Sequence, residues 1–140
     1  MPTYRSSVEI AAPPDVVFER IADIGRHGDW STDPLEISSD GKDRFRSTTR
    51  AKGKVITAEI TVVERQAPRL LAFDVVDATG RWRHTFTLEA SPAGGTRVVR
   101  ATSGRLSAAQ AVLYWVVLLP VKKPNASRAL RKLKSLVEAG

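Results

Sequence analysis

The chain has 140 residues, of which 42% are hydrophobic and 26% charged, as is usual for one folded globular domain. It contains no cysteine, which excludes disulfides, thiolate nucleophiles and cysteine-ligated metal sites. With only two histidines, a histidine-rich metal centre is not expected either, and we expect no cofactor. The longest apolar run, Ala111–Leu119, is shorter than the roughly 20 residues that span a bilayer, and the start does not follow the signal-peptide pattern. We therefore expect a cytoplasmic protein with a single domain over residues 1–140.

The formal net charge is +7, with an acidic first third and a basic remainder. Such an imbalance is typical of some nucleic-acid-binding or membrane-binding surfaces. Here the basic residues stand singly along expected strands, where they suit the solvated face of a sheet. No helix-turn-helix or RNA-binding signature accompanies them, so nucleic acid is not an expected partner.

The first elements are a strand and two short helices. Residues Tyr4–Ile10 alternate and predict a strand that ends at a proline turn. Pro14 suits the first turn of a helix, and the spacing of apolar residues predicts an amphipathic helix over Asp15–Ile24. Gly25 ends it, and Arg26–Trp30 is expected to form another short helical turn. A polar connection, Ser31–Asp43, follows.

The middle of the chain has the period of two that β-strands show. Alternating segments separated by glycine or proline turns cover residues 44–51, 56–62, 71–75, 81–88 and 96–103. One side of each segment is apolar and the other polar, which predicts an antiparallel sheet covered on one face. In the last strand two sets compete for the inner face: Val98, Arg100 and Thr102 against Val99, Ala101 and Ser103.

The C-terminal third must cover that face. Residues Ser107–Leu118 are apolar all round and predict a buried helix. Pro120 and Pro124 then predict a kink or break, and whether the helix continues across residues 119–125 stays open. Beyond them one face is apolar, with Leu130, Leu133 and Val137.

Four segments carry a resemblance to a known family. They are Val8–Phe18, in which a strand runs into a proline turn and a helix, and then Gly28–Trp30, Ala67–Phe73 and Gly95–Val98. Over nearly its whole length the chain resembles the START-like helix-grip superfamily (SRPBCC), in its polyketide cyclase/dehydrase-like branch. The resemblance implies an α+β fold: a curved antiparallel sheet of about seven strands around a long C-terminal helix, with two short helices after the first strand. It also implies an elongated space for an apolar small molecule between sheet and helix.

We expect that space to be lined from the sheet's inner face and from the helix. The candidate ligand-binding residues are Trp30, Phe45, Ser47, Thr49, Ile56, Ile60, Phe73, Trp82, Phe86, Val112, Trp115, Val116 and Leu119. Alternatives stay open for several of them: Trp30 as a cap at the cavity mouth, Trp82 and Phe86 as core, and Trp115 as a partner contact. Ser47 and Thr49 are equally understood as small strand residues.

Two function classes follow. The first is a carrier of a hydrophobic metabolite such as a lipid, a polyketide or an isoprenoid, which needs a cavity but no catalytic group. The second is a polyketide cyclase/dehydrase-type enzyme, in which His84 is the acid/base residue and Ser47 or Thr49 orients a carbonyl. No metal site is expected from the loop that holds His27 and Asp29.

A third hypothesis is membrane-surface association through the basic C-terminal helix. Its cations are Lys122, Lys123, Arg128, Arg131, Lys132 and Lys134. The alternative is an ordinary solvated helix face with cations near the helix end. Monomer and homodimer are both left open.

Overall fold

The computed structural model describes residues 3–51, 53–78, 80–105, 107–113 and 119–139. Its seven strands form one antiparallel sheet in the order β1-β7-β6-β5-β4-β3-β2. The strands are β1 Thr3–Ile10, β2 Leu35–Ser39, β3 Arg44–Ala51, β4 Lys54–Gln66, β5 Leu70–Asp77, β6 Gly80–Ala90 and β7 Thr96–Arg105. The helices are α1 Pro14–Ala22, the 3-10 helix η1 Ile24–Asp29, α2 Ala108–Leu113 and α3 Leu119–Ala139. The expected α+β helix-grip fold is confirmed.

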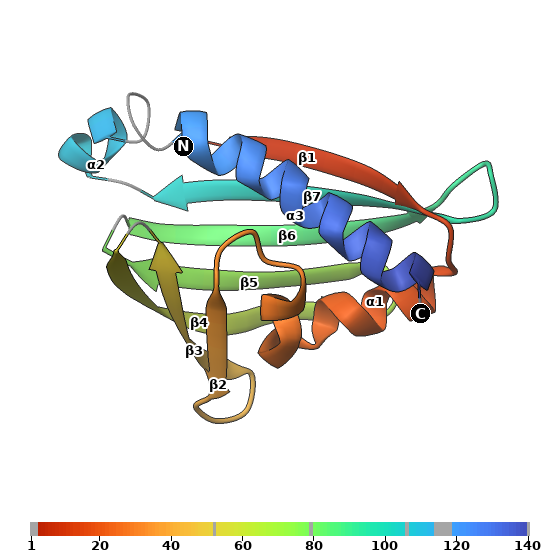
Figure 1. The fold of residues 1–140 in the computed structure, drawn as a ribbon, viewed down its shortest axis with the longest axis horizontal. Coiled ribbons are helices and arrows are strands. Elements are labelled where there is room, and N and C mark those ends of the chain that lie inside the picture. Colours follow the sequence, from red (N-terminus) through yellow and green to blue (C-terminus); the bar gives the residue numbers. More distant parts are fainter. Residues whose placement is uncertain (1–2, 52, 79, 106, 114–118, 140) are drawn as a thin grey trace.

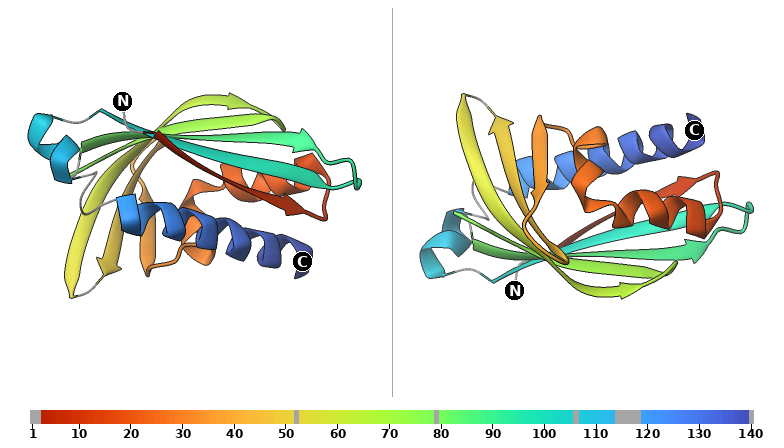
Figure 2. Two further views of the ribbon diagram at one scale, coloured as in Figure 1. Left: turned by 90° about the horizontal axis from the view of Figure 1, so that it is seen from above. Right: turned by 90° about the horizontal axis from the view of Figure 1, so that it is seen from below.

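The sheet bends around the helices. Figure 2 shows α3, α1 and η1 on the same side of the sheet, with the β3–β4 end curling toward that side. Figure 1 shows α3 running obliquely across β1, β7 and β6. Within the stretch expected to be only a polar connection, the structure forms the short strand β2, which pairs with β3. Helix α3 therefore lies against the inner, concave face of the sheet.

The two short elements after β1 begin and end close to their expected bounds. Pro14 opens α1, where a missing N–H costs no intrahelical hydrogen bond. Val17, Phe18 and Ile21 are the buried residues of α1, at helical spacing. The next turn, η1, is a 3-10 helix that brings His27 inward and ends at Trp30.

Helix α3 is continuous from Leu119 to Ala139, so the helix does not break at Pro124; residues 114–118, which join it to α2, lie outside the described residues. Pro120 lies in the first turn, where its missing N–H would have no intrahelical partner. Pro124 lies inside the helix but near its start, and the missing bond is offset by the packing of the later turns, where Leu130 and Leu133 are fully buried. At the other end, Glu138 accepts a hydrogen bond from the Ala11 backbone N–H (2.8 Å).

The core is divided into two clusters. The larger one joins α1 and η1, the inner face of the sheet and α3, and it includes Ile21, Phe73, Phe86, Leu130 and Leu133. The smaller one consists of Tyr4, Trp82 and Ala126. The indole of Trp82 lies against Gly104 on the neighbouring strand, where a Cβ would come within 2.8 Å of its ring. The glycine thus makes room for the indole.

Candidate functional site

A cavity of about 300 Å³ lies between the sheet and α3. This is the lower end of the range for small-molecule sites and corresponds to roughly ten water molecules. It is lined by Tyr4, His27, Trp30, Ser31, Thr32, Asp33, Leu35, Thr49, His84, Arg100, Ala126 and Ala129. The space is thus smaller and more polar than the elongated apolar hollow expected from the resemblance.

The residues of α3 explain why the space exists at this place. Toward the cavity the helix presents the small side chains of Ala126 and Ala129. One turn further on, Leu130 and Leu133 are fully buried and fill the space between helix and sheet. The cavity therefore lies beside the N-terminal half of α3.

Arg100 is the unexpected residue of this wall. It lies on the inner face of β7, with Val98 and Thr102, which settles the register that the sequence left open. Desolvation by the surrounding protein lowers its pKa, and the nearby Tyr4 raises it slightly. The guanidinium lies 5.3 Å from the Phe86 ring centre, and its buried Nε has no hydrogen-bond partner among the residues that the structure describes. In the described part of the chain Arg100 takes part in no salt bridge.

His84 lies beside Arg100 on the neighbouring strand. Its Nδ1 is 3.2 Å from a terminal nitrogen of Arg100 and 3.2 Å from Oγ1 of Thr102. A guanidinium can only donate, so Nδ1 is the acceptor and the neutral imidazole carries its proton on Nε2. The ring is stacked on Phe73 at 5.2 Å between centroids. Arg100 thus fixes both the orientation and the tautomer of His84.

Tyr4 of β1 lines the cavity together with Arg100 and His84, and these three residues form its polar end. In the sheet, Tyr4 pairs with Thr102 of β7. Burial raises the pKa of its phenol, while the charge of Arg100 and a hydrogen bond with Thr102 act in the opposite direction. The phenol therefore stays protonated at neutral pH and adds an O–H group to this end of the cavity.

His27 is a structural histidine. Its Nε2 donates to the Ile21 carbonyl (2.6 Å), and its ring packs on Trp30 at 4.6 Å. Burial lowers its pKa to about 4, so the ring is neutral at physiological pH. No cluster of three metal-ligating side chains is found among the described residues.

The candidates named from the sequence fall into four groups. Trp30, Thr49 and His84 line the cavity. Four residues point inward as expected but belong to the packed core: Ile60, Phe73, Trp82 and Phe86. Ser47 is buried, and Phe45 is half-buried and packs against the core. Ile56 (41% exposed, near the tip of the β3–β4 hairpin) and Val112 (66% exposed, in α2) do not line it. Trp115 and Val116 lie outside the described residues, and so does the side chain of Leu119.

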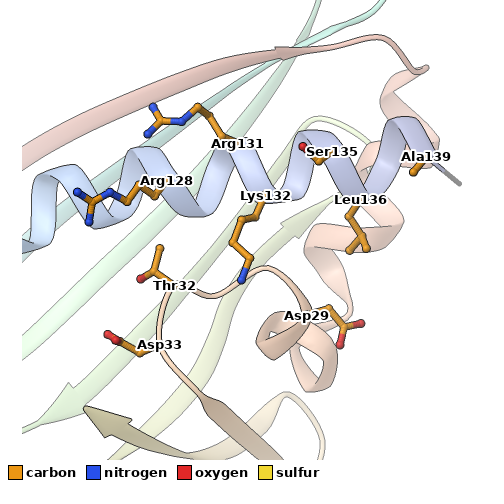
Figure 3. A pocket seen from close by; sticks show the side chains of 9 residues that line it. All are labelled: Asp29, Thr32, Asp33, Arg128, Arg131, Lys132, Ser135, Leu136 and Ala139. Carbon is orange, nitrogen blue, oxygen red and sulfur yellow. The ribbon is translucent and has the colours of Figure 1, made fainter. Parts of the chain in front are cut away.

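A second hollow, a surface groove of about 850 Å³, lies on the outer side of α3. Figure 3 shows it between the helix and the loop that holds Asp29 and Asp33. Lys132 donates to the Ser31 carbonyl across it (2.6 Å), which ties the loop to the helix. Arg131 points to the other side of the helix (Figure 3), so the basic residues do not converge on one point.

Two further basic residues of α3, Arg128 and Lys134, also have interactions within the chain. Lys134 donates to the Glu9 carbonyl and pairs with Glu138, and Arg128 has its own interactions. Every helix among the described residues is too short or too polar to pass through a bilayer. These contacts favour a structural role for the basic face over membrane-surface association.

Comparison with known proteins gives one family and many similar folds. Residues 1–138 match the family described as polyketide cyclase / dehydrase and lipid transport. A structure from Thermus thermophilus is 22% identical with a TM-score of 0.78, covering 99% of this chain and 98% of that one. The Zhui aromatase/cyclase of a Streptomyces species is 18% identical with a TM-score of 0.76, covering 98% and 93%. No curated protein matches the chain. At these identities the structural likeness concerns the fold.

Proposed function

Since the chain belongs to the polyketide cyclase/dehydrase and lipid transport family, we propose that it binds a small, largely apolar molecule in the cavity between the sheet and α3. The observation that carries the proposal is the cavity itself, a partly open space of about 300 Å³ between the inner face of the sheet and α3. Concave spaces of this kind, with a few polar groups in their lining, are where small molecules bind in proteins. Its volume favours a compact ligand over a long-chain lipid.

The test uses the fluorescent probe N-phenyl-1-naphthylamine, which is neutral and apolar. We expect saturable binding at one site per chain, because the probe is held within the cavity. Ala129→Leu places three more carbons in the cavity and should weaken binding at least tenfold. Ser135→Leu is the matched control: it introduces the same side chain on the same helix, but in the outer groove, and should leave binding unchanged.

Equal binding to the two leucine variants would show that the probe does not occupy the cavity, and the proposal would fall. Native mass spectrometry of the gently purified protein gives an independent readout. A co-purified small molecule that is present in the wild type and absent from Ala129→Leu is the expected result.

A second candidate function is catalysis of the cyclase/dehydrase type, favoured by the contact between Arg100 and His84. A guanidinium beside the cavity would stabilise the negative charge that develops on a carbonyl oxygen under attack. The Nε2–H of His84 would donate a hydrogen bond to that oxygen as the attacking α-carbon forms the new carbon–carbon bond. Solvent would take up the proton that the α-carbon loses and supply the proton that the new alkoxide gains. Turnover of a poly-β-ketone that is lost in His84→Gln, with probe binding retained, would identify an enzyme. Equal turnover in both proteins would exclude this role of His84.

A further inference from the structure

We infer that the ligand of this cavity is a small apolar carboxylic acid whose carboxylate pairs with Arg100. The inference rests on the proposed function and adds the chemical class of the ligand. It starts from the charge of Arg100, which stays protonated under all physiological conditions. Charged side chains within a protein are normally paired, because an unpaired one keeps its full desolvation cost.

The second step is the lack of a compensating carboxylate. Among the described residues, no salt bridge includes Arg100, and the charge that acts on it comes from Tyr4, which is neutral at physiological pH. Among the described lining residues, Asp33 is the only one with an acidic side chain, and it lies in the loop that also borders the outer groove (Figure 3). The described part of the cavity wall therefore holds a cation without its counter-ion.

The third step is an excess of donors over acceptors. Nε of Arg100 and Nε1 of Trp30 are both buried and have no acceptor among the described residues. A carboxylate is an acceptor-only group with two oxygens, and it is the usual partner of a guanidinium.

The rest of the lining determines the size and polarity of the part of the ligand beyond its carboxylate. Trp30, Leu35, Ala126 and Ala129 offer apolar surface, and about 300 Å³ must hold the whole molecule. A chain or ring system of moderate size with one acidic end matches a lining that is apolar in one part and cationic at Arg100. A neutral hydrocarbon would leave the charge of Arg100 without a counter-ion, which is unfavourable for a desolvated cation.

The experiment compares decanoate with decan-1-ol, which have equal chain lengths and differ in charge. Each displaces bound N-phenyl-1-naphthylamine from the wild type, from Arg100→Met, from Arg100→Lys and from Arg97→Met. Arg97 lies on the same strand but is exposed on the outer face, so its replacement removes one positive charge without touching the cavity.

We expect the wild type and Arg97→Met to prefer decanoate at least tenfold. In Arg100→Met the preference should disappear while the probe and the alcohol still bind, and Arg100→Lys should retain part of it, because lysine keeps the charge without the planar fork. Equal displacement by acid and alcohol in the wild type, or a preference that survives in Arg100→Met, would overturn the inference but leave the proposed function standing.

If the probe does not bind the wild type, the proposed function fails on its own test. The inference is then decided by the melting temperature in the presence of decanoate. A rise in the wild type that is missing in Arg100→Met supports it, and no rise in either protein refutes it.

Discussion

Replacing Arg100 by methionine should stabilise the ligand-free protein. The substitution removes a cation from the interior but keeps an unbranched side chain of similar length next to Phe86. Buried ionic groups that are exchanged for apolar residues of similar volume often give a neutral result or a gain of about 1–4 kcal/mol. The direction of the effect follows from the missing counter-ion.

The structure also shows what the substitution costs. One hydrogen bond from a charged donor to His84 is lost, typically about 1.5–3 kcal/mol, and so is the cation–π contact with Phe86, about 0.5–2 kcal/mol. The effective desolvation penalty of a buried ion is several kcal/mol. The loss at His84 is reduced because Oγ1 of Thr102 lies within reach of the same Nδ1. We expect a net gain of about 1 kcal/mol, or roughly 3 °C in melting temperature.

The assay is urea unfolding of protein stripped of small molecules, followed by circular dichroism. Arg97→Met serves as the control, because an exposed substitution on the same strand should change the free energy of unfolding by no more than about 0.5 kcal/mol. A loss of about 1 kcal/mol or more in Arg100→Met would refute the reasoning, since it would mean that the guanidinium is already compensated within the protein.

Two further predictions concern the supporting structure. Gly104→Ala brings a Cβ within 2.8 Å of the Trp82 ring and should cost about 1–3 kcal/mol in urea unfolding; an unchanged midpoint would contradict the packing described for this indole. The folded-state pKa of His27, about 4, lies below its ordinary value of 6.5, so the unfolded chain binds the proton first as the pH falls. The contribution of neutral His27 is complete above pH 6.5 and is lost toward pH 4, by up to about 3 kcal/mol. His27→Gln should remove this part of the pH dependence, and parallel curves for the two proteins would exclude it.

Local patterns were sufficient to predict most of the elements, while the helix-grip arrangement was implied by the family resemblance. The alternation along β6 and the helical spacing in α1 gave elements close to the observed ones, because each has one clearly apolar side. The continuity of α3 through Pro124 could not be predicted, because the missing N–H of a proline is a local signal, whereas the helix is held by the packing of later residues such as Leu133. Tertiary packing of this kind has no local signal.

The site was predictable only in part. Trp30, Thr49 and His84 were placed at the cavity, but Arg100 was not, because both sides of β7 carry similar residues. The signal lay in the hairpin: once β6 and β7 pair across the turn at Gly94, Phe86 stands opposite Arg100 and Trp82 opposite Gly104. Because paired residues lie on the same face of a sheet, an inward-facing Phe86 implies that Arg100 also faces inward. The small volume followed from core packing, which the pattern of apolar residues does not reveal.

The pairing of β1 with β7 has a consequence for how occupancy can be observed. Tyr4 of β1 and Arg100 of β7 line the same cavity although they are far apart in the sequence, and β1 is an outermost strand with a neighbouring strand on one side only. A ligand that contacts both residues would stabilise the pairing of β1 with β7. Ligand binding should therefore slow amide hydrogen exchange in residues 4–10 more than in the central strands. The reason is that an edge strand opens locally at a lower free energy than the centre of a sheet.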